Sequence, residues 1–577
     1  MTDPSGKSTG AIHHWRLPLI LALIHIFLAL PAVLSGWMND DYFFDTPLYE
    51  TDAPLGYYDF MAQFKEAHLH PWWTSPDYQL RFFRPLASLS IHLDFLVGGG
   101  APLFAHLDSL MWSLVMLFGG FAIFRQILHE DRTRKWAMII FTLSVCHTWA
   151  AGWVAARHSV MSGAFTVWAA AIYLRWRVNH HPRHGVAPAV LFALGLLCGE
   201  TALALVLFVT CYEFAGSSDP WRSRLRRLLP IAAIACLYVV AYSAMGFGAR
   251  GSGAYIHPFL YPGDYFALLV PKMLAVTGAF GFGIPAILRP IPQIGGLTWI
   301  AGIITVLLLC VALLRVGRFS DIQRSHLLRW LLLAIFFPQL PALSGLAQGR
   351  EFILSQIAFS GVIALVLPPL FVRADKWPGT LISRGIASLL LLGALGINPL
   401  LRAAQSGFIY MSSVAMADAG RHASLECAPN APVYVINGDF MRSVGFPFAV
   451  ARHQQRIFPA WQHLNTPESD IVVERLGQTL FKVNSTDNSP LINDFLHLYR
   501  RPTNGLTAGS RFQFPYLQAE VLAANESGPT VVTYDIPALA NPDGICLLQY
   551  RDGTLTTWTP PSVGQSTTVK FVPPFQQ

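Results

Sequence analysis

The sequence predicts a polytopic α-helical membrane protein with a β-rich C-terminal soluble domain. Hydrophobic residues make up 53% of the 577 residues and charged residues only 13%, about half the roughly 25% charged content of a soluble domain. The mean hydropathy is +0.43. Although the net charge of +7 could suggest a nucleic-acid partner, Lys and Arg collect in short clusters between apolar segments. This pattern is typical of membrane topology, and we predict no nucleic-acid partner.

About eleven apolar segments are expected to cross the membrane. The first, 17–37, is long enough for a hydrocarbon core of roughly 30 Å. Because it lacks a small-residue cleavage site, we predict a retained anchor. The others are 103–124, 136–152, 160–176, 186–199, 201–212, 228–245, 297–314, 331–346, 352–372 and 381–400.

Two segments do not read as simple membrane spans. Segment 186–212 is too short for two full spans and too long for one, so we expect two short helices or a hairpin around Glu200. Segment 265–292 is apolar but rich in Gly and Pro. We expect it to be re-entrant or interfacial, because irregular backbone at membrane depth needs protein or a wet cavity beside it.

The basic clusters predict the topology. They all fall on one side if 265–292 does not cross, and the positive-inside rule makes that side cytoplasmic. An odd number of crossings then places the C-terminal region outside. We therefore predict a bacterial inner-membrane protein with a cytoplasmic N-terminus, a membrane domain over 1–400 and a periplasmic or lumenal mixed α/β domain over 401–577.

The two expected outer regions differ in character. The first loop, 38–100, is aromatic, and its amphipathic stretch 56–73 is expected at the membrane interface. For the tail we predict a helical linker over 408–423. Strands are expected after it, in the runs 432–438, 470–476, 529–536 and 545–558.

Two of the seven cysteines, Cys427 and Cys546, lie in the polar tail. They could pair in an oxidising compartment, but spacing alone does not show their separation, so both the paired and the free state stay open. The other five lie in apolar segments, where a small buried hydrophobe is the ordinary role.

A pair of carboxylates ends the first apolar segment, in the stretch GWMNDDYFFDT. Asp40 and Asp41 precede three aromatic residues that would hold them near the interface, where a carboxylate could act as general base toward a hydroxyl group. The alternative is an ordinary helix end in water. Because adjacent residues point in different directions, we expect one to catalyse and the other to orient it, bind a cation or cap a helix.

Cations and further acids follow in the outer segments. Arg84 directly precedes Pro85 and an apolar run, a position suited to binding phosphate through the guanidinium fork or to reaching lipid headgroups. His106 and Asp108 lie inside an expected span, where ionisable groups usually face a cavity or a partner, although they could form a structural pair. The remaining candidates in outer turns are Arg157, His158, Glu200, His257 and Arg350.

Arg350 begins an apolar helix. A cation at a helix start opposes the helix dipole, so Arg350 should have an anionic partner. Jointly, these acids and cations are what a site for a phosphate-bearing lipid and a hydroxyl acceptor would need.

Motifs of soluble enzymes are missing from the sequence. It contains no Walker A motif, no G-x-G-x-x-G after a strand, no H-E-x-x-H, no paired C-x-x-C and no G-x-S-x-G. This disfavours a nucleotide-activated donor and favours a donor carried by lipid.

The order of the motifs resembles the GT-C superfamily of polytopic glycosyltransferases, and most of all the membrane portion of the tetratricopeptide-tailed O-mannosyltransferases and their bacterial relatives. The likeness covers roughly residues 15–370. It rests on Asp40-Asp41, FRPL at 83–86, PLFAHLDSLMW at 102–112, WVAARHSVMSGAF at 153–165, GETALAL at 199–205 and GREFILSQIAFS at 349–360.

The resemblance implies an inverting glycosyltransferase that moves a hexosyl or pentosyl group from a polyprenyl-phosphate donor to an acceptor hydroxyl at the outer face. It makes Asp40 and Asp41 the catalytic pair. It places Arg84, Arg157, His158, Glu200 and Arg350 around the donor's phosphate and sugar, with His106, Asp108 and His257 in support. No cofactor is required, and a divalent metal is allowed.

Three departures from the resemblance concern the acceptor more than the reaction. Gly199 stands where relatives usually have Lys, His147-Thr148 stands where they often have His-Pro, and no tetratricopeptide tail follows. The acceptor therefore stays open among glycan, lipid and protein.

Two other functions would also need polar groups in a membrane. A transporter or flippase of lipid-linked saccharides usually has duplicated halves and broken helices, and no duplication is visible here. A polysaccharide polymerase or ligase usually centres on a later outer loop. The charges gathered on the expected outer face favour the transferase.

Overall fold

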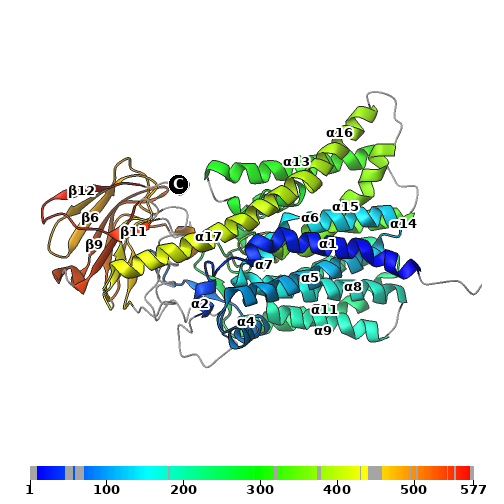
Figure 1. Ribbon diagram of the computed structural model, residues 1–577, viewed down its shortest axis with the longest axis horizontal. Helices are drawn as coiled ribbons and strands as arrows, with labels where there is room; N and C mark the ends of the chain where they lie inside the picture. The colour runs from blue at the N-terminus through cyan, green and yellow to red at the C-terminus, as the bar shows by residue number, and fades with distance from the viewer. Residues whose placement is uncertain are drawn as a thin grey trace, which may run out of the picture. The chain divides into compact units, whose positions relative to one another are not determined.

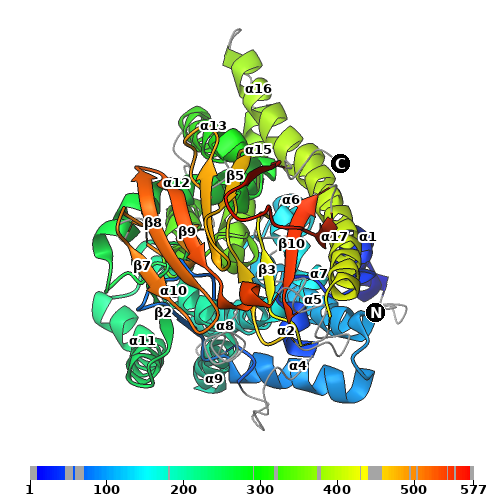
Figure 2. The same cartoon turned by 90° about the vertical axis from the view of Figure 1, so that its left-hand side faces the viewer.

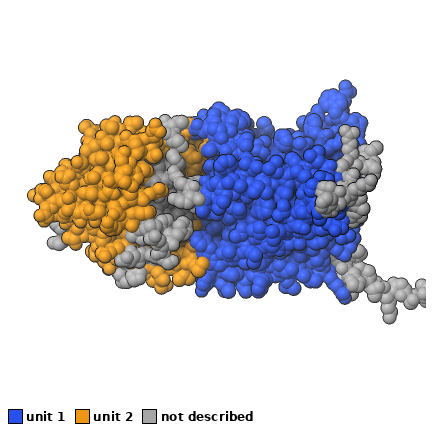
Figure 3. Space-filling view, turned by 90° about the horizontal axis from the view of Figure 1, so that it is seen from above, with its two compact units in different colours: residues 1–35, 83–246, 258–410 blue, residues 36–82, 247–257, 411–577 orange. Residues whose placement is uncertain are grey.

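The computed structural model describes residues 9–45, 56–58, 70–179, 182–289, 292–316, 322–372, 379–428, 430–438, 458–492, 496–501, 505–541, 544–551 and 554–571. The chain divides into two compact units, coloured separately in Figure 3. Unit 1 comprises residues 1–35, 83–246 and 258–410, and unit 2 comprises residues 36–82, 247–257 and 411–577.

Unit 1 is a bundle of helices (Figure 1). Its longer helices are α1 (Thr9–Val33), α5 (Pro102–Ile127), α8 (Arg157–Asn179), α9 (Pro182–Cys198), α11 (Trp221–Ala244), α12 (Pro262–Phe282), α13 (Pro292–Val316), α14 (Ile322–Phe336) and α15 (Ile353–Val372). Shorter ones are α4 (Pro85–Gly98), α6 (Asp131–Leu143), α7 (Thr148–Gly152), α10 (Ala204–Cys211) and α16 (Gly379–Leu391). Helix α17 (Asn398–Glu426) begins in unit 1 and ends in unit 2.

The bundle has a buried centre and an apolar outside. In α15, 89% of the most apolar window is buried, whereas in α11 only 6% is. Large apolar side chains of α11, among them Leu229, Leu237 and Val240, are exposed. A bundle that presents such residues outward is suited to lipid. The protein is an integral membrane protein with a C-terminal β-rich region.

Among the described residues, eight helices are long and apolar enough to cross a membrane. They lie at Trp15–Val33, Pro102–Ile127, Trp221–Ala244, Pro262–Phe282, Ile294–Val316, Arg324–Ser344, Arg350–Phe371 and Thr380–Asp418. Four of the eleven expected spans, 136–152, 160–176, 186–199 and 201–212, are not in this set. The expected count of eleven is therefore not confirmed.

Much of the segment expected to be re-entrant or interfacial, 265–292, lies in one helix, α12, which is a candidate span by its length and composition. A glycine on each helix allows α12 and α13 to pack closely: a Cβ at Gly278 of α12 would lie 2.6 Å from Thr298 O, and one at Gly302 of α13 would clash with Leu274 O. Small residues allow such close helix contact in membranes. With α12 as a candidate span, the odd-number argument for an outer C-terminus no longer holds.

The chain breaks at Glu200, as expected. Helix α9 ends at Cys198, Gly199 is extended, and a 3-10 turn over Glu200–Leu203 leads into α10. Two short helices thus replace one long span, and Glu200 stands at the start of the second.

The described residues of unit 2 form three sheets, and Figure 2 shows the larger two. A four-stranded sheet has the order β11 (Thr554–Thr557), β10 (Cys546–Arg551), β3 (Val433–Val435) and β4 (Trp461–His463). A six-stranded antiparallel sheet has the order β12 (Ser566–Val569), β5 (Ile471–Arg475), β6 (Leu480–Ser485), β9 (Gly528–Asp535), β8 (Gln518–Asn525) and β7 (Arg511–Gln513). The four strand-forming runs expected in the tail are confirmed as β3, β5, β9 and the hairpin β10–β11.

The third sheet joins the first outer loop to a distant segment. Strand β1 (Gln79–Arg81) pairs antiparallel with β2 (Gly248–Arg250). Buried Trp72 and Trp73 belong to the same hydrophobic core as Tyr434 and Tyr534 of the large sheets. Unit 2 therefore includes 36–82 and 247–257 as well as the tail, a grouping that differs from the linear division at residue 400. Of the amphipathic stretch 56–73, residues 59–69 lie outside the described part.

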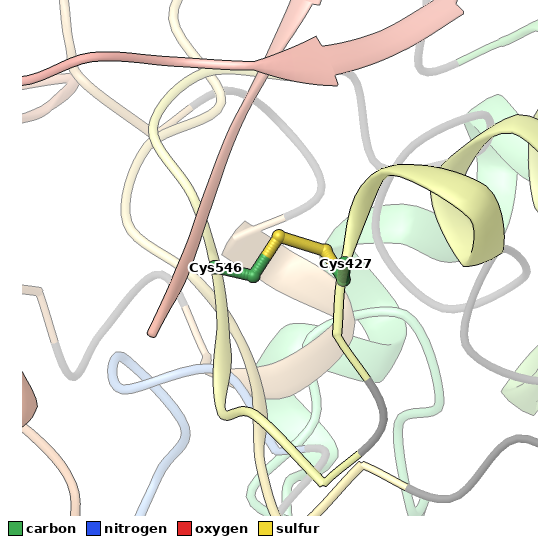
Figure 4. The surroundings of a disulfide bond; sticks show 2 residues. All are labelled: Cys427 and Cys546. Atoms are coloured by element: carbon green, nitrogen blue, oxygen red, sulfur yellow. A yellow bond between two sulfur atoms is a disulfide. The ribbon is translucent and has the colours of Figure 1, made fainter. Parts of the chain in front are cut away.

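Cys427 and Cys546 form a disulfide with a Cα–Cα distance of 5.5 Å (Figure 4). The bond joins the segment just after α17 to the first residue of β10.

Removal of this disulfide should lower the stability of unit 2. The bridge closes a loop with a sequence separation of 119, and loss of a native disulfide typically costs about 2–4 kcal/mol. We expect the Cys427→Ala/Cys546→Ala protein to unfold at a lower temperature in detergent, measured by thermal scanning fluorimetry. Cys236→Ala, at an exposed free cysteine, is the control. Equal midpoints for both proteins would show that the bridge contributes no stability.

Candidate functional site

The acidic pair lies in a tight turn that begins unit 2. Asn39 has φ 51°, a left-handed conformation that Asn tolerates better than most residues. The Met38 N–H donates to Asp41 Oδ2 at 3.1 Å, and the Asp41 N–H donates back to Met38 O at 3.0 Å. Asp41 is fully buried, whereas Asp40 is half-buried. Asp41 thus braces the turn and Asp40 is the more accessible carboxylate.

Asp40 lies among aromatic residues of unit 2. Burial raises the pKa of Tyr78 and of Tyr499 well above the ordinary range, and the negative charge of Asp40 adds to both shifts. Burial also lowers the pKa of His70, which lies beside Tyr78, to about 4. Tyr78, Tyr499 and His70 are therefore uncharged at neutral pH.

Asp41 acts on a different side chain. Burial raises the pKa of Tyr42 to about 12, and the charge of Asp41 contributes to this shift. The two carboxylates thus have different surroundings, as expected for adjacent residues.

In unit 1, the charged candidates stand where helices begin. Arg84 caps α4, Arg157 is the first residue of α8, Glu200 opens a 3-10 turn, and Arg350 opens the 3-10 turn before α15. Carboxylates favour helix N-termini and cations oppose them. Each of the three arginines accordingly has an acidic partner.

Glu200 accepts hydrogen bonds from Arg84 and from a tyrosine. Arg84 donates from Nε at 3.1 Å and from Nη2 at 2.9 Å to Glu200 Oε2, and the Tyr242 hydroxyl donates to Oε1 at 2.9 Å. Of the sequence-predicted residues, Arg84 and Glu200 are therefore brought together although 116 positions separate them. Tyr242 was missed because a single hydroxyl within apolar α11 gives only a weak signal.

Arg157 lies at the centre of a buried ion cluster. Its guanidinium is fully buried and forms ion pairs with Asp94 of α4 and with Asp108 of α5, the latter at 3.0 Å. It also donates to Ser109 Oγ at 3.0 Å and to Ala105 O at 2.6 Å. Asp108 therefore pairs with Arg157, while His106 contacts Ala151 O at 3.0 Å and Ser35 Oγ at 3.3 Å. His106 and Asp108, for which a structural pair was the alternative expectation, thus contact different residues.

Arg350 is the cation of a small cleft. It contacts Glu351 at 3.4 Å, the anionic partner that the helix dipole requires, and it lies 4.9 Å above the Trp153 ring. Gly349 precedes it with φ 104°, a conformation that favours glycine. The cleft is lined by Ser159, Gly163, Thr166, Thr201, Ala204, Arg350, Glu351, Ile353 and Leu354.

His158 lies at the start of α8, beside the turn of Glu200: a Cβ at Gly199 would lie 3.4 Å from its Cδ2. Arg84, His158, Glu200 and Arg350 all lie in unit 1, where Arg84 and Glu200 are paired, while Asp40, Asp41 and His257 lie in unit 2. Burial and the charge of Arg250 lower the pKa of His257.

A second buried polar cluster in unit 1 was also missed. Arg402 of α17 is fully buried and donates to Thr142 O and, at 3.1 Å, to His25 Nδ1 of α1. His25 contacts Ser113 Oγ of α5 at 2.9 Å. The place of Arg402 directly after an apolar run could have indicated a buried cation, but the same pattern also indicates the end of a membrane helix.

Within the described residues, no group of three or more His, Cys, Asp or Glu side chains could hold a metal ion. A divalent metal stays a sequence prediction.

Comparison with known proteins gives one curated relative and several structures. No family model matches the chain. The protein is 29% identical over 175 residues to the protein O-mannosyl-transferase Tmtc2 of Drosophila melanogaster, a match that covers 28% of this chain and 18% of the relative. This confirms the resemblance to O-mannosyltransferases, and the match spans less than a fifth of the relative's length.

Solved structures are similar at low identity. The oligosaccharyltransferase of Archaeoglobus fulgidus, tethered with an acceptor peptide, has a TM-score of 0.44 and 16% identity, covering 78% of this chain and 64% of that chain. ArnT from Cupriavidus metallidurans, bound to undecaprenyl phosphate, has a TM-score of 0.39 and 13% identity, covering 93% and 100%. The arabinofuranosyltransferase AftD from Mycobacteria has a TM-score of 0.35 and 13% identity, covering 90% and 41%.

Proposed function

We propose that the protein is an inverting glycosyltransferase that moves a sugar from a polyprenyl-phosphate donor to an acceptor hydroxyl at the outer face of the membrane. The cleft of Arg350, which lies in the helix bundle and is lined partly by polar side chains, is the observation that carries the proposal. A buried guanidinium there is suited to an anion that arrives on a lipid. The similarity to a protein named as an O-mannosyl-transferase supports sugar transfer.

The proposed reaction is one displacement. The acceptor oxygen attacks the anomeric carbon, the bond from that carbon to the phosphate oxygen breaks, and the acceptor proton passes to a carboxylate. Asp40 takes this role because it is half-buried, whereas Asp41 is fully buried and braces the turn. A positioned carboxylate accelerates such a step as general base.

The departing polyprenyl phosphate leaves with negative charge. Arg350 stabilises that charge, and His158 and the Arg84–Glu200 pair shape the polar surroundings on the same side of unit 1. Preorganised charge where charge develops is usually the largest catalytic contribution. Arg157 is proposed to support this region through Asp94 and Asp108, because its guanidinium is already engaged by them.

The outer-face location of unit 2 is part of the proposal. Its disulfide supports an oxidising compartment. A bacterial inner membrane with unit 2 in the periplasm meets this requirement.

The proposal can be tested with the full chain in lipid nanodiscs and a panel of radiolabelled polyprenyl-phosphate hexoses and pentoses. The expected result is labelled glycosidic product together with free polyprenyl phosphate. Arg350→Gln should lower the rate strongly, and Arg324→Gln, at an exposed arginine of the same unit, should not. In liposomes, lipid translocation without any glycosidic product would support the transporter alternative and overturn the transferase.

A further inference from the structure

The first outer loop is folded into the core of the β-rich region. Trp72 and Trp73 are fully buried, and the Trp72 Nε1–H donates to Leu464 O at 2.9 Å. The Trp72 ring contacts the rings of Phe512 and Tyr534 at centroid distances of 5.4 and 5.7 Å. Two buried tryptophans in this core make the loop part of the domain's fold and not an appendage.

Consecutive tail residues Tyr499 and Arg500 hold the loop backbone just after these tryptophans. Arg500 is buried and donates from Nε to Trp73 O at 2.7 Å and from Nη2 to Thr74 O at 3.2 Å. The Ser75 N–H donates to Tyr499 O at 2.9 Å. Three hydrogen bonds therefore fix residues 73–75 on the tail.

The same segment carries a neighbour of the proposed base. Tyr78 follows three residues after Ser75, and its ring lies 5.3 Å from that of Tyr499. Farther along this segment, the Phe82 N–H donates to Tyr58 O at 3.1 Å, and the Tyr58 ring lies 5.3 Å from that of Phe44, in the short helix Asp41–Asp45 that directly follows Asp40. The charge of Asp40 also acts on the phenols of Tyr78 and Tyr499. Contacts made by the tail thus lead through Tyr78 to the surroundings of Asp40.

We propose that Arg500 is a positioning residue: by holding the carbonyls of Trp73 and Thr74, it lets the C-terminal region set the place of Tyr78 and, through Tyr78, the surroundings of the Asp40 carboxylate. The inference rests on the proposed function for its effect on catalysis. It gives the C-terminal region a role in turnover, beyond stability.

The first test compares Arg500→Met with Arg500→Lys in the full chain. Arg500→Met leaves two carbonyls without their donor, and misplacement of a catalytic group by about 1 Å can cost on the order of 100-fold in rate. We expect Arg500→Met to lower kcat by about 10- to 100-fold with the donor KM unchanged, and Arg500→Lys, which can still donate, to recover part of kcat. Arg511→Ala, at an exposed arginine of β7, is the control and should keep full kcat.

The second test does not depend on enzyme activity. Hydrogen–deuterium exchange of the full chain should show faster exchange over 70–82 and 36–45 in Arg500→Lys and Arg500→Met, and no change in Arg511→Ala. Normal exchange over 36–45 with full kcat in Arg500→Lys and Arg500→Met would overturn the inference. If exchange increases but no variant or native protein transfers sugar, the proposed function fails while the structural coupling stands.

Should Arg500→Met fail to fold, Arg500→Lys alone decides the question. A fall in its thermal midpoint with an unchanged kcat would assign Arg500 a purely structural role. A fall in kcat with an unchanged donor KM and a shifted pH–rate profile supports the positioning role, because a structural residue would not move that profile.

Discussion

Asp40→Asn is expected to lower kcat for sugar transfer by about 10²–10⁴-fold, the usual contribution of a general base. Asparagine has nearly the shape of aspartate but does not accept the proton of the acceptor hydroxyl. Because Asp40 is not expected to bind the donor, its KM should change little. Initial rates with a labelled polyprenyl-phosphate sugar, at saturating donor and acceptor, measure the effect.

Asp41→Asn is the matched comparison. Its amide oxygen can still accept the Met38 N–H that Asp41 Oδ2 accepts in the native turn, so the loss in kcat should be under about tenfold, as for a retained hydrogen bond of lower charge. A larger loss in Asp41→Asn than in Asp40→Asn would transfer the role of base to Asp41. Full activity in both variants would remove this pair from the mechanism.

Arg157→Met is expected to destabilise unit 1 by about 3–5 kcal/mol, the typical cost of removing one partner from a buried ion pair. The substitution leaves the Asp94 and Asp108 carboxylates, whose side chains are 9% and 19% exposed, without their cation. The protein should unfold at a clearly lower temperature in detergent. Thermal scanning fluorimetry and size-exclusion profiles after graded heating measure the change.

Three further variants distinguish the loss of the buried ion pair from the loss of packing. Arg134→Met removes a partly exposed ion pair with Asp131 and should have almost no effect, since such pairs contribute about 0–1 kcal/mol. Arg157→Lys keeps the charge but not the fork of donors and should be intermediate. Adding Asp94→Asn to Arg157→Met should restore part of the loss, because one unpaired charge disappears; no restoration would place the cost in packing instead.

The elements that could be predicted from the sequence are those with a local signal. Runs rich in strand-forming residues predicted β5 and β9, and the break at Glu200 followed from a segment too short for two spans. The need of Arg350 for an anionic partner followed from its place at a helix start, and Glu351 meets it.

The features that could not be predicted depend on contacts between residues far apart in the sequence. The glycines of α12 read as helix breakers, yet they allow close packing on α13, and the same residue type serves both purposes. The pairing of Arg84 with Glu200 needs the bundle to bring distant turns together. The burial of Trp72 and Trp73 was hidden because aromatic residues in an outer loop also suit a membrane interface.

The hydrogen bond between Trp72 and Leu464 spans 392 positions of the chain, and this has a consequence for biosynthesis. At about 5–20 residues per second, a ribosome needs about 20–80 s to make the intervening chain. Throughout that interval the two tryptophans lack their core, and closing so long a loop slows folding further. The turn with Asp40 therefore gains its complete surroundings only after the tail has been synthesised. An unfinished chain would lack the folded surroundings of the Asp40 and Asp41 carboxylates.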